Sequence, residues 1–332
     1  MRENKPLIIL ILFLLLILTS FTGILFGSVF IEPSSVIKSL FSNDTDTTVR
    51  TLIITVRLPR VLGGLFAGIG LACAGVILQG VMNNSLASPN TIGVNSGSGF
   101  AVMLGMMLFP SNALVIPGFA FCGALLTSLL VFLLAYVADS SRTTIILAGI
   151  TISSFLSAGI NAIKLLDTDI SINLTSFMVG SLSSLTTSKL VLPCALIVAA
   201  FLISLFFAGS LNLLGLGDDI ARSLGMNVPF TRFLLLVLAS IMAGSVVSYA
   251  GLLSFIGLIV PHICRQLFGN DARILLPCSA LLGGSFVILC DLLGRILFAP
   301  FELPAGIIMA FIGGPFFLYL LLKKKGGRRI NA

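Results

Sequence analysis

Few residues in this chain have side chains that could perform bond chemistry. The single histidine, His262, stands in Pro261-His262-Ile263-Cys264-Arg265 with no Asp, Glu or second histidine beside it, which argues against a metal site. The six cysteines form no C-x-x-C pair and lie in or beside apolar stretches, so they are expected to be small buried hydrophobic residues, at positions 73, 122, 194, 264, 278 and 290. Neither H-E-x-x-H nor Gly-x-x-x-x-Gly-Lys-Ser/Thr occurs. We therefore expect no catalytic residue, no bound metal and no cofactor, ATP in a P-loop included.

Charged residues beside or within long apolar stretches are the exception. Arg57-Leu58-Pro59-Arg60 precedes one apolar stretch, where Pro59 suits the first turn of a helix that follows it. Asp291 and Arg295 are four residues apart in another stretch, which places them on one helical face as an ion pair. Such charges are costly in a membrane and often functional. For Arg57 and Arg60 two interpretations stay open, docking of a partner's carboxylates or a structural role. For Asp291 and Arg295 the two are a functional charge or a purely structural pair.

The stretches that position these residues are those of a membrane protein. Hydrophobic residues make up 57% of the 332 residues and charged residues 9%, against about 25% charged in globular proteins. This composition disfavours soluble enzymes, nucleic-acid-binding proteins and disulfide-stapled secreted domains. A membrane-spanning helix needs about 20 apolar residues. Ten such runs occur, near 7–30, 61–80, 91–109, 113–137, 144–165, 189–211, 230–248, 250–267, 275–297 and 304–322.

Two of these ten runs are weak. The run at 91–109 contains Asn95, Ser96 and Ser98. The stretch 230–267 is interrupted only by Ser248-Tyr249-Ala250-Gly251, so a broken or very short eighth helix is an alternative. The first run resembles a secretory signal, but without a clear cleavage site it is expected to be an anchored helix. We predict an all-α polytopic membrane protein with one transmembrane domain over residues 1–332.

The distribution of basic residues predicts the orientation. With ten spans, 12 of the 19 Lys and Arg residues fall on the side that carries both termini and seven on the other. Cytoplasmic loops carry the excess of Lys and Arg, so both termini are expected to be cytoplasmic. The basic tail, residues 323–332, would then lie beside the anionic inner leaflet of the membrane lipid.

Small residues repeat along the second run. Gly64, Gly68 and Ala72 are spaced by four, and Gly75 follows about one turn later. Small residues at this interval let two helix backbones approach closely in a membrane. Tight packing within one subunit is the favoured interpretation, and a translocation path lined by backbone is the alternative.

The loop after residue 211 contains the pattern of a short helix. Asp218 suits an N-cap for a helix through about Arg222, and Gly225 suits its end. Ile220, Ala221 and Leu224 would form a small apolar face. Such a face predicts docking into a groove on a cytoplasmic partner. The alternative is a helix that lies on the membrane surface.

Four segments resemble the FecCD-type permease family, the membrane subunits of ATP-binding-cassette importers for ferric siderophores, haem and cobalamin. They are RLPRVLGGLFAGIGLACAGVILQGVMNNSLASPNTIGV (57–94), LGDDIARSLGMNV (216–228), GLLSFIGLIVPHICRQLFGND (251–271) and DLLGRILFAPFELPAGIIMAFIGGPFFLYLL (291–321). The similarity covers about 57–322, nearly everything after the first helix. One departure lies in Asn83-Asn84-Ser85-Leu86-Ala87, where the family usually has Arg-Asn-Pro-Leu-Ala.

The resemblance implies a ten-helix subunit of type II importer architecture in the bacterial cytoplasmic membrane. It implies pairing with a second copy or a close paralogue, two separate ATPase subunits beneath, and a substrate-binding protein on the outer face. Three groups of residues acquire roles through it. These are binding-protein docking at Arg57, Arg60 and Arg295; ATPase coupling at Asp218, Asp219, Ala221, Arg222, Ser223, Leu224 and Gly225; and cytoplasmic gate loops at Asn83, Asn84, Ser85, Leu86, Ser141, Arg142, Thr143 and Thr144.

The function implied is a permease without an ATPase site of its own. Ferric siderophore is the first expectation for the cargo, with haem or cobalamin as alternatives. An ion-coupled secondary transporter is the rival from another class. It would need acidic residues inside the membrane, and apart from Asp291 the predicted spans contain none.

Overall fold

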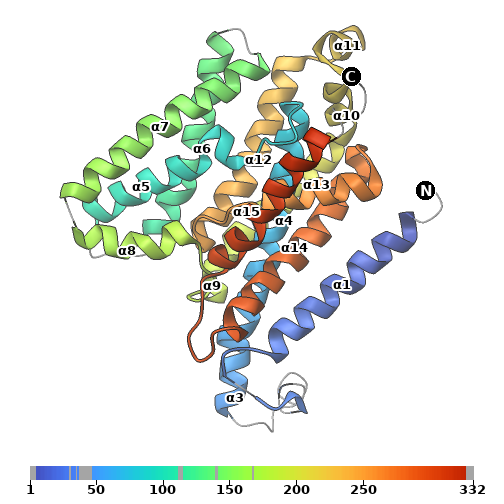
Figure 1. The fold of residues 1–332 in the computed structure, drawn as a ribbon. Helices are drawn as coiled ribbons and strands as arrows, with labels where there is room; N and C mark the ends of the chain where they lie inside the picture. Colours follow the sequence, from blue (N-terminus) through green and yellow to red (C-terminus); the bar gives the residue numbers. More distant parts are fainter. Residues whose placement is uncertain are drawn as a thin grey trace.

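The computed structural model describes residues 5–29, 31–34, 36, 47–110, 115–138, 141–166 and 168–326. All regular elements in these ranges are helices, and the helices pack together in a single bundle (Figure 1). The N-terminal Arg2 and the end of the basic tail, 327–332, lie outside the described residues.

In the part of the chain that the structure describes, seven helices are long and apolar enough to cross a membrane, and three more apolar helices are shorter. The long ones are α1 (Lys5–Leu25), α4 (Leu58–Val81) with the helical turns before it, α6 (Val115–Val137), α7 (Arg142–Leu166), α9 (Thr187–Phe206), α12 (Val228–Ala250) and α14 (Ala272–Ile296). The shorter ones are α5 (Val94–Leu108), α13 (Ile256–Phe268) and the apolar part of α15 (Ala305–Gly326), which is Ala305–Leu320. The prediction of an all-helical polytopic membrane protein with about ten spans is confirmed.

Short helices occupy the connections between the spans. They are α3 (Thr47–Leu52), η1 (Ile53–Arg57), η2 (Pro89–Ile92), α8 (Thr168–Val179), α10 (Ala208–Leu216) and α11 (Asp218–Ser223). We call the end of the bundle that carries α11 the Arg142 end, and the opposite end the Arg60 end. The Arg142 end lies toward the top of Figure 1.

The helix that contains Pro59 starts earlier than predicted. The backbone is helical from Thr47 onward, so Arg57-Leu58-Pro59-Arg60 lies inside a continuous helix and not at its start. A single π-helical turn, Ile53–Arg57, comes directly before α4. This wider turn accommodates a proline that has no N–H to donate. Pro59 occupies the first turn of α4, as predicted, but the preceding α3 and η1 make that turn internal to a longer helix.

The stretch 230–267 is broken, as the sequence alternative allowed. Helix α12 ends at Ala250, the next residues are not helical, and α13 begins at Ile256 after Phe255, whose φ is +68°. The end of α8 satisfies part of the freed backbone, because Leu252 N donates to Phe177 O at 2.9 Å. Such pairing is what non-helical backbone at membrane depth requires.

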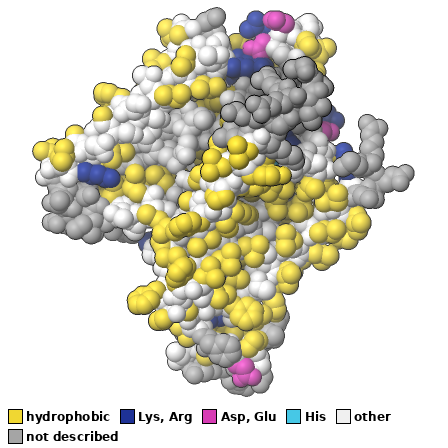
Figure 2. All heavy atoms as spheres, in the orientation of Figure 1, with side chains coloured by type: hydrophobic (Ala, Val, Ile, Leu, Met, Phe, Trp, Pro, Cys, Tyr) yellow, Lys and Arg dark blue, Asp and Glu magenta, His cyan; other side chains and the backbone are white. Residues whose placement is uncertain are grey.

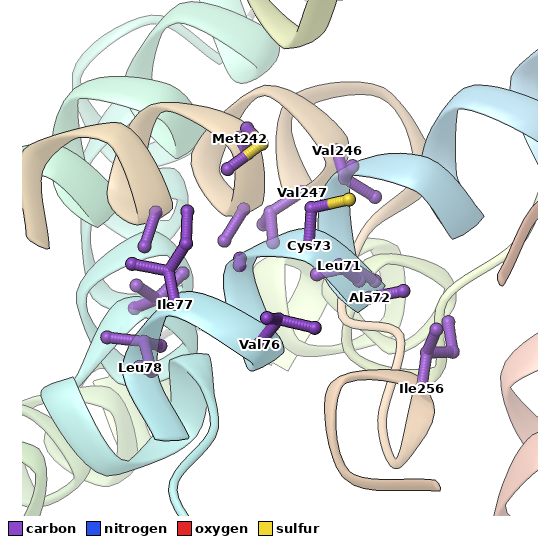
Figure 3. Packing of buried hydrophobic residues seen from close by; sticks show 14 of the residues in the cluster. Leu71, Ala72, Cys73, Val76, Ile77, Leu78, Met242, Val246, Val247 and Ile256 are labelled. Atoms are coloured by element: carbon purple, nitrogen blue, oxygen red, sulfur yellow. The ribbon is translucent and has the colours of Figure 1, made fainter. Parts of the chain in front are cut away.

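The centre of the bundle is α4. Of its apolar window 78% is buried, against 17% for α1 and 22% for both α7 and α9, which lie at the periphery. Figure 3 shows buried side chains of α4, such as Val76 and Ile77, in one cluster with Met242, Val246 and Val247 of α12. Gly68 meets the backbone of Gly283 in α14 so closely that a Cβ would collide with it. The predicted packing role of these small residues is confirmed.

The surface fits a membrane environment. Figure 2 shows hydrophobic side chains covering the middle of the visible face, while many of its charged side chains gather toward the top, near α11. Exposed apolar residues on the peripheral helices include Leu165 at 89%, Phe155 at 78% and Leu192 at 69%. A water-soluble monomer rarely exposes such extensive apolar surface.

Candidate functional sites at the two ends of the bundle

At the Arg60 end, one arginine holds two carboxylates. Arg60 Nε lies 2.9 Å from both oxygens of Asp291, and its Nη1 lies 2.6 Å from Glu302 Oε2. The predicted pair of Arg295 with Asp291 is confirmed, at 3.2 Å between Nε and Oδ2. Ser28 donates to the other oxygen of Glu302 at 2.7 Å. The sequence analysis missed Glu302, which follows α14 in the chain.

The other arginines at this end bind the C-terminal end of α1. Arg57 donates to the carbonyl oxygens of Ile24, Leu25 and Val29 at 2.9, 2.6 and 2.7 Å. Arg295 donates to Gly23 O at 3.1 Å and to Phe26 O at 3.3 Å. The last carbonyls of a helix have no partner within it and carry partial negative charge, so cations suit this position.

These contacts give the three arginines a structural role. Arg57, Arg60 and Arg295 are only 3%, 4% and 2% exposed. Their guanidinium groups lie beneath the end of α1 and beside Glu302, and each is bonded within the chain. Before a partner's carboxylate could bind one of these guanidinium groups, a hydrogen bond or ion pair that the group makes within the chain would have to break. The docking role therefore stays a prediction.

Glu302 is the more accessible partner in this network, with 30% of its side chain exposed. Burial by itself raises the pKa of Glu302, but hydrogen bonds from Arg60 and Ser28 and the charge of Arg60 outweigh it. The pKa of Glu302 consequently lies below its usual range, and its carboxylate is ionised at neutral pH.

At the Arg142 end, Asp218 binds two arginines. Arg232 Nη2 lies 2.6 and 2.7 Å from its two oxygens, and Arg142 Nη2 lies 2.8 Å from Oδ1. Arg142 Nη2 also donates to Leu214 O at 2.8 Å. The predicted N-cap role of Asp218 is wrong, because Gly217 occupies the N-cap position and no side chain caps α11. The carboxylate of Asp218 points to the arginines instead.

The predicted apolar face of α11 is divided between two sides. Ala221 is buried, whereas Ile220 is 49% and Leu224 61% exposed. The helix ends at Ser223, and Gly225 follows with a φ of +84°, the left-handed conformation predicted for it. Asp219, Arg222 and Ser223 are exposed. The short helix thus turns two apolar side chains away from the protein.

The two predicted gate loops lie in different surroundings. Arg142, in the loop 141–144, binds Asp218 together with Arg232. Within the same stretch Ser141 Oγ and Thr144 Oγ1 are hydrogen bonded at 2.7 Å, and Thr143 is exposed. Asn83, Asn84 and Ser85 instead line a polar cavity of about 560 Å³. Ser85 and Leu86 also line an apolar cavity of about 290 Å³ between α13 and α15, so this loop separates the two.

The polar cavity contains residues that the sequence analysis did not single out. Arg265 donates to the amide oxygen of Gln79, and Gln79 in turn donates to Gly257 O at 3.0 Å. Asn212 donates to Asp271 Oδ1 at 2.8 Å, and this bond, together with the backbone N–H of Arg273, lowers the pKa of Asp271. The sequence offered one signal for these residues: Gln79, Asn212 and Asp271 each lie at or near the end of an apolar run.

His262 lines the apolar cavity. Its Nε2 is 2.9 Å from Gln266 Nε2, and its ring meets Phe316 edge-on. Among the described residues, no group of three or more His, Cys, Asp or Glu is arranged to hold a metal ion.

Comparison with known proteins gives a consistent result over nearly the whole chain. The model of the FecCD transport family matches residues 12–323. The Fe(3+)-citrate import system permease protein YfmE of Bacillus subtilis (strain 168) is 38% identical over 323 residues, which cover 96% of each chain. The hemin transport system permease protein HmuU of Yersinia pestis is 35% identical over 298 residues, covering 88% of this chain and 89% of that protein.

A solved structure shares the fold. It is described as the inward-facing conformation of an ABC transporter of the metal-chelate type, and it superposes with a TM-score of 0.83 at 30% sequence identity. The superposition covers 96% of this chain and 99% of the other.

Proposed function

This chain belongs to the FecCD transport family, and from that premise we propose that it is the permease subunit of an ATP-binding-cassette importer for iron chelates. The observation that carries the proposal is the end-to-end similarity to the Fe(3+)-citrate permease, at 38% identity over 96% of both chains. The bundle of apolar helices supplies the framework that such a permease needs. Because the sequence contains no P-loop, ATP hydrolysis is assigned to partner subunits.

A ferric chelate such as a siderophore is the proposed cargo. Besides the citrate permease, a probable siderophore permease and an iron(3+)-hydroxamate permease, both of Bacillus subtilis, are 38% and 33% identical to this chain. The hemin permease, at 35% identity, supports haem as the second candidate. Cobalamin, the third member of the sequence expectation, has weaker support. The rival secondary transporter would need acidic residues inside the membrane, and Asp291 is the only one in the apolar runs of the sequence.

The Arg142 end is proposed to face the cytoplasm and to receive the ATPase subunits. Support comes from the excess of basic residues on this side and from α11, which exposes Ile220 and Leu224. A small apolar face on a short helix suits a groove on a protein partner. Both termini are then cytoplasmic, in a bacterial cytoplasmic membrane.

The Arg60 end is proposed to receive the substrate-binding protein. The cluster of Arg57, Arg60 and Arg295 with Asp291 and Glu302 carries three positive and two negative charges. A carboxylate of the binding protein could replace Glu302 on Arg60, since the Glu302 side chain is partly exposed. Electrostatic complementarity of this kind speeds docking and fixes its register.

Two copies of this chain, or this chain and a close paralogue, are proposed to surround the path. The loops 83–86 and 141–144 would then lie near its cytoplasmic gate. Support comes from the two cavities beside 83–86 and from the exposed apolar surface of α7 and α15, which a second subunit could cover.

Uptake of iron-55 tests this function. Cells with and without the gene are offered a panel of ferric siderophores, ferric citrate and haem, each with and without a protonophore while ATP is maintained. The proposal predicts loss of uptake for one ferric chelate in the deletion strain and little effect of the protonophore. Loss of haem uptake alone would favour the second candidate, and a strongly protonophore-sensitive signal would contradict an ATP-driven importer.

A further inference from the structure

The ion pair between Arg142 and Asp218 joins two of the predicted sites, the coupling segment and one gate loop. We propose that Arg142 is a positioning residue, through which a movement of α11 is passed to α7 and α8. This inference rests on the proposed function, because it needs an ATPase partner that moves α11.

The first step is the position of Asp218 between two helices of different kinds. Arg232 belongs to α12, whose apolar window is 72% buried, and Arg232 itself is only 2% exposed. Arg142 begins α7, whose window is 22% buried. One carboxylate at the start of α11 therefore connects a central helix and a peripheral one.

The second step is the strength of the connection on the α7 side. Arg142 Nη2 contacts both Asp218 Oδ1 and Leu214 O at 2.8 Å, so it binds the end of α10 as well as the start of α11. The side chains of Arg142 and Asp218 are 23% and 28% exposed. Partial removal from water strengthens such a pair beyond an exposed one. Asp218 makes no cap bond to its own helix, so these arginines are what it binds.

The third step concerns α7 and α8 taken together, at the end away from Arg142. Helix α8, which follows α7 in the chain, ends against the break before α13: Leu252 N donates to Phe177 O at 2.9 Å, and Ser181 N donates to Ala250 O at 2.9 Å. It also contacts the start of α15, where Gly306 N donates to Gly180 O at 3.1 Å. A Cβ on Gly306 would collide with Val179 O.

The α7–α8 unit is thus attached at both ends and lies at the periphery between them (Figure 1). Each of the two helices moves as a rigid element, and α7 and α8 contact each other and α5. A shift of α11 that pulls Arg142 would therefore be felt at the break before α13 and at the start of α15. A physical argument for coupling requires such a connected element with two attachments. The Arg142–Asp218 pair is its attachment to the ATPase side.

The test uses the purified complex of this chain with its ATPase subunits in proteoliposomes. Arg142→Gln removes the positive charge. Arg142→Lys keeps the charge but replaces the planar guanidinium group by an ammonium group. Arg273→Gln is the matched control. Arg273 is an exposed arginine at the same end, outside the cluster. Three quantities are measured: retention of the ATPase, the rate of ATP hydrolysis, and the amount of iron-55 chelate transported per ATP hydrolysed.

We expect Arg142→Gln to retain the ATPase and to hydrolyse ATP, while transport per ATP falls by about fivefold or more. Arg142→Lys should be intermediate and Arg273→Gln unchanged. An unchanged ratio in Arg142→Gln would overturn the inference, and so would loss of the ATPase from that variant, which would make Arg142 a docking residue. If Arg142→Gln does not fold, a wild-type ratio in Arg142→Lys would overturn it. Failure of the unaltered chain to bind an ATPase would instead refute the proposed function.

Discussion

Arg60 and Asp291 are 231 positions apart in the sequence, yet Arg60 Nε lies 2.9 Å from both oxygens of Asp291. Both side chains are buried, at 5% and 3% exposure. The pair ties the central helix α4 to α14, along the same interface where Gly68 meets Gly283. Helices α4 and α14 are therefore held together in two places, by an ion pair at the Arg60 end and by close backbone packing further along.

Asp291→Asn should be strongly destabilising. Removing one partner of a buried ion pair leaves the other charge uncompensated and costs about 3 to 5 kcal/mol. Here two arginines, Arg60 and Arg295, would lose the same carboxylate. Unfolding of purified protein in detergent by denaturant measures the change in free energy. Glu32→Gln, which alters an exposed carboxylate, is the control; equal stability of both variants would contradict this account.

Gly68→Ala should force α4 and α14 apart. The added Cβ would collide with the carbonyl of Gly283, which is backbone and cannot rotate away. Overpacking of this kind costs about 1 to 3 kcal/mol. Gly314→Ala is the matched control, since it adds the same atom to a helix where nothing lies within 4 Å. Thermal unfolding in detergent should separate the two, and a Gly68→Ala protein as stable as the control would argue against close packing here.

Ile220→Asp and Leu224→Asp should release the ATPase. Each places a charge on the exposed side of α11, where an apolar partner groove is proposed. The amount of ATPase that co-purifies with the permease is the measurement, and we expect it to fall at least about tenfold, a change of about 1.4 kcal/mol. Leu267→Asp introduces the same charge on α13 at the same end, where the side chain is 42% exposed. Full retention of the ATPase by both α11 variants would exclude this surface as the docking site.

Glu302→Gln distinguishes the two interpretations of the arginine cluster. If Arg60 receives a carboxylate of the binding protein, weakening its internal partner should raise the affinity of the binding protein, and Arg60→Gln should lower it. Both effects should weaken at high salt. Binding to the reconstituted permease is measured by surface plasmon resonance, with thermal stability recorded in parallel. Reduced stability with unchanged affinity in both variants would leave the cluster with a structural role alone.

The same residue predicts a pH dependence of stability. The pKa of Glu302 is lower in the folded protein than in the unfolded chain, so its stabilising contribution is complete above the unfolded value of about 4.3. It is lost as the pH falls through the lowered pKa. The difference in melting temperature between the unaltered protein and Glu302→Gln should stay constant from pH 7 to about pH 5 and shrink as the pH falls below about 4. A difference that already shrinks between pH 7 and pH 6 would contradict the assignment.

Local patterns predicted much of this fold. Apolar runs located the spans, including the weak α5 and the break before α13. Both the apolar character of a span and its interruption depend on residues that are neighbours in the sequence. The pairing of Asp291 with Arg295 followed from helical spacing alone. Of the apolar side chains predicted for α11, Ile220 and Leu224 are exposed and Ala221 is buried, since a six-residue helix turns only one side inward.

Contacts between distant segments could not be predicted in this way. Arg60 reaches Glu302 across 242 positions, and Arg142 reaches Asp218 across 76, so no spacing rule relates them. Asp218 had an equally good local partner, the backbone of its own helix, and the tertiary contact to two arginines prevailed. The π-helical turn before Pro59 was missed because proline normally marks a helix start.

The bonds from Arg57 and Arg295 to the end of α1 also set an order for biosynthesis. Helix α1 leaves the ribosome before the helices that follow it, and its final carbonyls then have no partner within the helix. Arg57 follows about thirty residues later and can bind them early, whereas Arg295 is synthesised some 270 residues later. A nascent chain that ends before α14 therefore holds α1 by one arginine, and Arg295 binds it only after α14 has been synthesised.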